Sequence, residues 1–368
     1  MEREKTNSIE AISLIIIIMI NHLILNFPNN IIFQTGSASI INVVYISIIS
    51  VLFFLIIYKM MNKFPGKNII DIAKYLGGEK LKNIISIIFV IYLIFVSSSL
   101  IRSFSEIIKI IYFPNANIFT IIFSFVLVSL IINSYGTRTV SKVNLLLMPI
   151  ILCSVAFIFL TSFKDFQFER IFPVLGYGVK ETFLDGLKNL YSFGGILCLF
   201  LIPSELEDYK KFKRVGLISI IISALYLLLS ISSLLFLFSS LSAGKELLSV
   251  YLNTRTIELG KTIQRVDAIF IMIWILAFIA YLSVIILFVK KIIVKNTTIK
   301  STSFMIFLIG IIISCISIIP INTSKISFLQ SNILCYFEMF LVFILCPIIM
   351  VLANIKKKNL ENRRINNV

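Results

Sequence analysis

The residues best placed for chemistry in this sequence are Asn21 and His22, a polar pair inside a long apolar run. The run extends from Ile9 to Phe33, and ~20 apolar residues suffice to cross the ~30 Å hydrocarbon core of a bilayer. The pair therefore falls near the midplane, where polar groups are costly and usually functional. His22 is the only histidine of the chain, and an imidazole can change its charge between about pH 5 and 8.

Two interpretations of this polar pair stay open. If the helix is broken here, the unwound backbone or a bound ligand would satisfy the polar groups. Alternatively, Asn21 and His22 hydrogen-bond to a neighbouring helix and hold the bundle together, a contact worth ~0.6 to 2 kcal/mol.

The glycine pair Gly194–Gly195 is a second candidate, because it interrupts another apolar run, Leu187–Pro203. Paired glycines remove side-chain bulk and permit a backbone turn whose freed N–H groups could meet a carboxylate. Two interrupted helices in corresponding halves of a chain are typical of a transporter-type binding site. A small-residue contact between helices is the alternative explanation of the pair.

Arg102 and Glu106 are four residues apart in an apolar run, so a helix places them on one face and close enough to pair. Arg102 lies ~30 Å along that helix from Lys82 at 1.5 Å per residue, which places the pair toward the outer end. The pair is either an outer gate or an ion pair at the membrane interface.

Composition defines the class of protein. The chain has 368 residues, of which 58% are hydrophobic and 14% charged, and a mean hydropathy of +1.01, which predicts a polytopic helical membrane protein. The net charge of +16 comes from Lys and Arg in short loops, so nucleic-acid binding is disfavoured. Walker, nucleophile-elbow, zinc and dinucleotide motifs are absent from the sequence. We therefore expect no enzyme activity, metal or cofactor.

The apolar runs predict an all-α fold of about ten membrane-spanning helices in a single membrane domain, residues 1–368. The interrupted first and sixth runs indicate two five-helix repeats of inverted topology, about 9–163 and 186–320, followed by a last helix at about 330–354. The predicted spans lie near residues 9–33, 39–61, 83–112, 117–134, 143–163, 186–204, 214–241, 266–293, 302–320 and 330–354.

Positive charge collects in every second loop, as expected of cytoplasmic loops, so both termini should face the cytoplasm. The loops between 163 and 185 and between 242 and 267 carry charges of both signs and are expected on the outer surface, where partners could bind. The basic segments are 59–82, 138–142, 210–214, 290–300 and 356–364.

Several short motifs follow one another along nearly the whole chain, and the most specific is Pro173-Val174-Leu175-Gly176-x-Gly178. With them the sequence resembles the spore-germination permease family, the B subunits of germinant receptors, which belongs to the amino acid/polyamine/organocation transporter superfamily. The other matching segments are Ile12-Ser13 and Phe27-Pro28, Arg102-x-x-x-Glu106, Ser192-Phe193 with Gly195 and Pro203, and Arg265-x-x-x-Ile269 followed by Trp274-Ile275.

This resemblance implies the ten-helix fold of sodium-coupled amino acid transporters, with a ligand site between helices one, three, six and eight. It also implies a sensor in the spore inner membrane that assembles with a soluble-domain-bearing A subunit and a lipoprotein C subunit. Where the family has a Gly-x-Gly type break in helix one, this chain has Asn21, His22 and Leu23. The residues expected at the ligand site are Asn21, His22, Leu23, Ser98, Ser99, Phe193, Gly194, Gly195 and Tyr281.

Three functions follow as hypotheses. The first is a germinant-receptor subunit that binds a small polar, amino acid-like germinant. The second is an ion- or proton-coupled amino acid transporter, which is disfavoured because the predicted spans hold almost no acidic residues away from their ends. The third is a passive scaffold, for which the two helix breaks would not matter.

Overall fold

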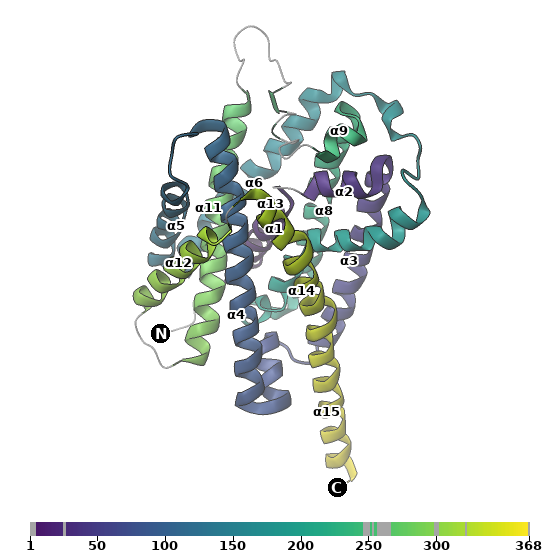
Figure 1. Cartoon of the computed structure of the whole chain (residues 1–368). Coiled ribbons are helices and arrows are strands. Elements are labelled where there is room, and N and C mark those ends of the chain that lie inside the picture. The colour runs from purple at the N-terminus through teal and green to yellow at the C-terminus, as the bar shows by residue number, and fades with distance from the viewer. Residues whose placement is uncertain are drawn as a thin grey trace.

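The computed structural model describes residues 5–24, 27–245, 251, 254–255, 266–297, 302–320 and 322–366. These residues form helices and their connections (Figure 1), and no β-strand occurs among them apart from an isolated bridge between Thr6 and Leu206. The predicted all-α membrane fold is confirmed.

Helix α1 (Ser8–Ile24) is the central helix of the bundle. Every residue from Ala11 to Asn21 is buried, and the helix packs against α6 (Thr137–Ser162), α8 (Phe212–Leu237) and α11 (Val266–Asn296). A helix that is apolar on all sides needs such an enclosed position. The first apolar run thus builds the core of the molecule.

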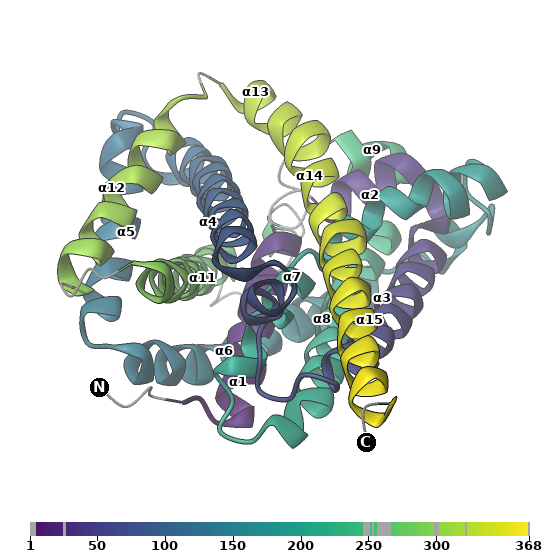
Figure 2. The same cartoon turned by 90° about the horizontal axis from the view of Figure 1, so that it is seen from below.

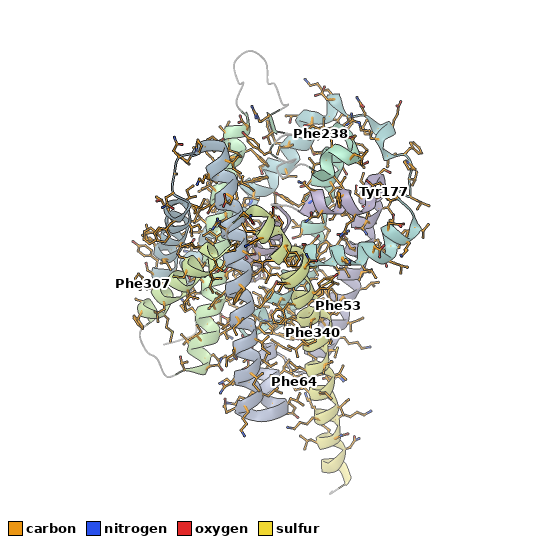
Figure 3. All side chains as sticks on the ribbon, in the orientation of Figure 1. Phe53, Phe64, Tyr177, Phe238, Phe307 and Phe340 are labelled. Carbon is orange, nitrogen blue, oxygen red and sulfur yellow. The ribbon has the colours of Figure 1, made fainter. Side chains whose placement is uncertain are left out.

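Helices α2 (Phe27–Thr35) and α3 (Ser39–Met61) follow α1 and meet at a 3₁₀ turn, η1 (Gly36–Ala38). In Figure 1, α2 lies across the view while α3 runs downward. Gly36 has φ +61°, and a Cβ on it would approach the Tyr177 ring to 3.2 Å. Tyr177, labelled in Figure 3, therefore packs the loop after α6 against this turn.

Helix α4 (Ile69–Tyr112) begins earlier than the predicted start at residue 83. Asn68 explains the early start, because its side chain accepts from Asp71 N–H at 3.0 Å while Asp71 accepts from Asn68 N–H, which is a capping box. The helix is then kinked at Gly77 and Gly78. Gly78 has φ +69° and ψ −160°, a conformation that is essentially restricted to glycine.

The sixth predicted span consists of short helical pieces rather than one α-helix. They are η4 (Lys180–Leu184), η5 (Asp185–Phe193), α7 (Ile196–Leu199) and η6 (Ile202–Ser204). The halves 180–193 and 196–204 meet at an angle of 54°. The predicted interruption at Gly194–Gly195 is present as this bend.

The last predicted span is a long rod in which α-helix alternates with π-helical turns. In Figure 1 its final part extends below the other helices toward the C-terminus. Its pieces are α13 (Thr323–Phe328), η8 (Leu329–Leu334), α14 (Cys335–Phe340), η9 (Leu341–Leu345) and α15 (Cys346–Asn366).

Helices α5 (Ile118–Ser134) and α12 (Thr302–Ile318) lie on one side of the molecule in Figure 2, and α3 and α15 lie on the other. A short helix, α9 (Ser240–Lys245), packs on α2. The remaining short turns are η2 (Phe163–Asp165), η3 (Phe168–Ile171) and η7 (Tyr209–Lys211).

Among the described residues, six helices are long and apolar enough to cross a membrane, and the bent pair around Gly194–Gly195 is a seventh candidate. Three further apolar helices are shorter, at 8–21, 118–134 and 303–318. The exact count of ten spans and the inverted-repeat relationship stay predictions.

The basic loop after α3 and the basic C-terminal helix lie together at one end of the bundle. Lys356 Nζ donates to the carbonyls of Tyr75 and Leu76, at 2.9 Å each, and Lys357 Nζ donates to the Lys63 carbonyl at 2.6 Å. We refer to this end as the basic end.

Candidate functional site

At the Gly194–Gly195 bend the sixth span packs tightly on α1. A Cβ on Gly195 would lie 2.6 Å from Met19 Cγ and 3.2 Å from Met19 Cα and N. Both glycines have ordinary right-handed helical angles, φ −56° and −54°. Glycine is therefore required here for close approach, and not for an unusual backbone conformation.

The backbone at the bend keeps 3₁₀ hydrogen bonds. Gly194 N–H donates to the Tyr191 carbonyl at 3.0 Å, and Leu197 N–H donates to the Gly194 carbonyl at 2.9 Å. The expectation of a freed N–H group is thus not met at Gly194 in this conformation. By contrast, the Ser192 hydroxyl is fully buried beside the bend and lacks a hydrogen-bond partner in the described part of the chain.

Asn21 connects α1 to α11. Its Nδ2 donates to the Ile17 carbonyl at 2.9 Å and to the Ala277 carbonyl at 3.1 Å. Helix α1 continues through Asn21 to Ile24, so it ends a few residues later than the break expected at the polar pair. For Asn21 the helix-packing interpretation is the one observed. The side chains of His22 and Leu23 lie outside the described residues.

Two of the expected site residues, Ser98 and Ser99, form hydrogen bonds with α4, α12 and η8 and not with the glycine bend. Ser98 Oγ donates to the Ile313 carbonyl of α12 at 3.2 Å. Ser99 Oγ donates to the Val96 carbonyl at 3.2 Å and accepts from Gln330 Nε2 of η8 at 3.3 Å. Their contacts join α4 to α12 and η8, whereas the glycine bend packs on α1.

Phe193 and Tyr281, the other expected site residues, are almost completely buried, at 1% and 0% exposure. The Tyr281 ring packs at 5.7 Å from the Phe278 ring along α11, and its hydroxyl interacts electrostatically with Cys198 of α7. Tyr281 therefore lies beside the segment that follows the glycine bend.

Sequence reasoning missed Glu338 of α14. This side chain is 1% exposed, and its carboxylate lies on Gly194 so closely that a Cβ there would overlap Oε1. It interacts electrostatically with Tyr92 of α4, Tyr191 of η5 and Tyr281. The available signal was a single acidic residue within the apolar run 330–354, because an ionisable group inside a span indicates function by default.

Arg102 and Glu106 form the predicted ion pair. Arg102 donates to Glu106 Oε1 from Nε at 3.0 Å and from Nη2 at 2.7 Å. Its Nη1 lies 3.5 and 3.4 Å from the carbonyls of Ser317 and Ile318 at the end of α12. The pair therefore caps α12, since a positive charge is favourable at a helix C-terminus.

Ion pairs also join the elements at the basic end. Lys291 of α11 pairs with Glu205, just after η6, and Lys295 Nζ lies 2.6 Å from Asp71 Oδ1 at the start of α4. Thr6 N–H, before α1, donates to the Glu205 carbonyl at 2.8 Å. The segments before α1 and after α7 are thus tied to each other and to α11.

The sequence matches a known protein family over most of its length. A family model described as "Spore germination protein" matches residues 5–326. The chain belongs to the spore germination protein family. Two relatives from Bacillus subtilis (strain 168) are Spore germination protein B2, 23% identical over 194 residues, and Spore germination protein YndE, 24% identical over 201 residues. The alignments cover 52% and 53% of this chain and 53% and 55% of the relatives, so the chain spans about half the length of the curated relatives it matches.

A solved structure supports the fold of this spore germination family member. The solved structure is that of a Na⁺-coupled sialic acid symporter in a substrate-bound outward-open state, and it aligns with this chain at a TM-score of 0.65 and 11% identity. The alignment covers 93% of this chain and 80% of the symporter chain. At this identity the likeness concerns the fold alone. The family match and the apolar helices together indicate an integral membrane protein of the permease type.

Proposed function

We propose that the protein is the membrane subunit of a germinant receptor and that it binds a small polar, amino acid-like germinant beside the Gly194–Gly195 bend. The observation that carries the proposal is the close packing of this bend on α1, with Met19 within 3.2 Å of the Gly195 Cβ position, in a chain of the spore germination protein family. Bent helices near the midplane form the binding sites of transporter folds.

Of the expected ligand-site residues, we retain Asn21, Phe193, Gly194, Gly195 and Tyr281. Asn21 would fix the end of α1 against α11, and the two glycines would let a ligand approach the backbone of the sixth span. Ser98 and Ser99 are better explained as contacts between α4, α12 and η8. A ligand would then favour one arrangement of α1 and the bend over another, which is how binding shifts a two-state bundle.

The proposed location is the spore inner membrane, with both termini in the cytoplasm and with A and C subunits of a germinant receptor as partners. The positive-inside rule supports this orientation, because the basic loop after α3 and the basic C-terminal helix lie at the same end of the bundle. The long outer loops would then be available to partners.

A germination assay tests this proposal. Spores whose receptor carries Gly195→Val should require at least tenfold more germinant when they are compared with wild-type spores at equal subunit abundance, measured by immunoblot. A matched Gly310→Val variant changes a glycine of α12 whose Cβ position meets side-chain ends of Leu130 and Val126, and should keep the wild-type response. An unchanged dose response in the Gly195 variant contradicts the proposed site.

The second candidate is an ion- or proton-coupled amino acid transporter. The buried Glu338 favours this transporter hypothesis, because carboxyl groups inside spans commonly serve proton or ion pathways. Radiolabelled amino acid uptake into proteoliposomes that collapses with the ion gradient would establish transport. A scaffold, the third candidate, requires that the Gly195 variant behave like wild type.

A further inference from the structure

Glu338 is a carboxyl group inside the membrane part of the chain, and it has no basic partner among the residues that the structure describes. It is 1% exposed, and among the described residues no Lys, Arg or His forms an ion pair with it. No regular hydrogen bond reaches either oxygen in that part of the chain, although the Tyr92 hydroxyl lies near enough to interact with it. A carboxylate excluded from water needs a proton or a cation to neutralise it.

The position of Glu338 is as informative as its charge. Its carboxylate covers Gly194, so it fills the space that this glycine leaves at the bend of the sixth span. Tyr92, which interacts with the Glu338 carboxyl, is ~30 Å from the end of α4 at Tyr112 and ~21 Å from the kink at Gly78, counted at 1.5 Å per residue. Glu338 therefore faces the bend deep within the bundle.

The surroundings of Glu338 suit an organic cation. Tyr92, Tyr191 and Tyr281 come from three separate elements and all interact electrostatically with its carboxyl. Aromatic faces attract ammonium groups, with tyrosine among the favoured rings, and a charge-assisted hydrogen bond to a carboxylate is about twice as strong as a neutral one. The described residues contain no group of three or more His, Cys, Asp or Glu suited to a metal ion.

The helix that carries Glu338 has the features of an adjustable element. Its six-residue segment α14 lies between the π-helical turns η8 and η9. Such turns hold an extra residue and frequently occur at functional sites. A shift of either turn would withdraw the carboxylate from Gly194 and open space at the bend.

We propose that Glu338 is the residue that binds the ammonium group of the ligand, at the Gly194 side of the bend. The inference rests on the proposed function, because it assigns a partner to one end of the amino acid-like germinant. Glu338 covers Gly194 in this structure, and its carboxylate would turn to the ammonium group when the ligand enters. The ligand class is accordingly a small molecule with a primary ammonium group.

Thermal-shift titration of the purified full-length protein tests this assignment. The probes are the twenty standard L-amino acids, and each one that raises the Tm is compared with its deaminated carboxylic acid. The wild-type protein should bind the amino acid at least tenfold more tightly than the deaminated analogue. Glu338→Gln should weaken amino acid binding at least tenfold, and Glu338→Asp should give an intermediate loss.

Cys346→Ser is the matched control, because it changes a buried core position of the same helical rod and should bind like wild type. The assignment is overturned if Glu338→Gln binds as tightly as wild type, or if the deaminated analogue does. It is also overturned if no amino acid shifts the Tm, or if only Na⁺ or pH does so.

A Gly195→Ala variant separates this inference from the proposed function. Loss of binding in Gly195→Ala together with wild-type affinity in Glu338→Gln would keep the site at the bend and reject the role of Glu338. Wild-type affinity in both variants would reject both.

Discussion

Gly195 of the sixth span and Met19 of α1 approach each other so closely that a Cβ on Gly195 would lie 3.2 Å from the Met19 backbone atoms N and Cα. Backbone atoms cannot yield as a side-chain end can. The absence of a side chain at Gly195 therefore permits the close approach of the sixth span to α1.

Gly195→Ala should destabilise the protein, because overpacking of a tight contact costs about 1–3 kcal/mol. The midpoint of thermal unfolding of the purified protein would measure the loss. Gly310→Ala is the control, since its Cβ would meet the side-chain ends of Leu130 at 2.8 Å, which can move. Equal midpoints for the two variants would show that the Gly195 contact is not tight.

Glu106→Gln should also lower stability, by about 1–3 kcal/mol, because the buried Arg102 would lose its charged acceptor. Lys109→Gln is the control, as Lys109 lies one turn from Glu106 and forms no ion pair among the described residues. A structural ion pair predicts a lower unfolding midpoint with an unchanged germinant dose response. An altered dose response at an unchanged midpoint would instead assign the pair to an outer gate.

Glu205→Gln should loosen the basic end, since Glu205 pairs with Lys291 and neighbours the backbone contact with Thr6. Partly exposed pairs contribute little, up to about 1 kcal/mol, so the expected effect is local opening rather than global unfolding. Hydrogen exchange of segments 5–12 and 200–211 should accelerate. Glu207→Gln, which changes an exposed neighbour, should leave hydrogen exchange of these segments at the wild-type rate. Equal exchange rates in both variants would contradict a role of Glu205 in holding the basic end together.

Asn42→Ala should detach the outer loop from α3. Asn42 Nδ2 donates to the carbonyls of Thr182 and Gly186 at 2.8 and 3.3 Å, and Asn42 Oδ1 accepts from Asn189 at 2.8 Å. Loss of these buried bonds should cost about 1–3 kcal/mol. Limited proteolysis should then cleave between 163 and 193 faster than in wild type. Ser47→Ala, whose hydroxyl bonds only within α3, is the control, and equal cleavage rates would refute the docking role.

The sequence predicted several elements correctly from local signals, although the polar pair at Asn21 did not mark the end of α1. Apolar runs located the helices, the glycine pair located the bend, and the four-residue spacing of Arg102 and Glu106 predicted their ion pair. The early start of α4 was missed because it depends on the Asn68 cap and on the kink at Gly78, which hydropathy does not register.

The surroundings of Glu338 could not be read from the sequence, because they combine Tyr92, Gly194 and Tyr281 from three distant segments. The hydrogen-bond partners of Ser98 and Ser99 could not be predicted from the sequence for the same reason. Serines lie at many positions of these helices, and only packing decides which neighbour each one meets.

The most direct test of the central claim is ligand binding by purified protein, measured as the affinity for amino acids in wild type, Gly195→Ala and Gly310→Ala below their unfolding temperatures. A ligand site at the bend predicts saturable binding in wild type and Gly310→Ala, and at least tenfold weaker binding in Gly195→Ala. Equal affinity in all three proteins would contradict a site at Gly194–Gly195.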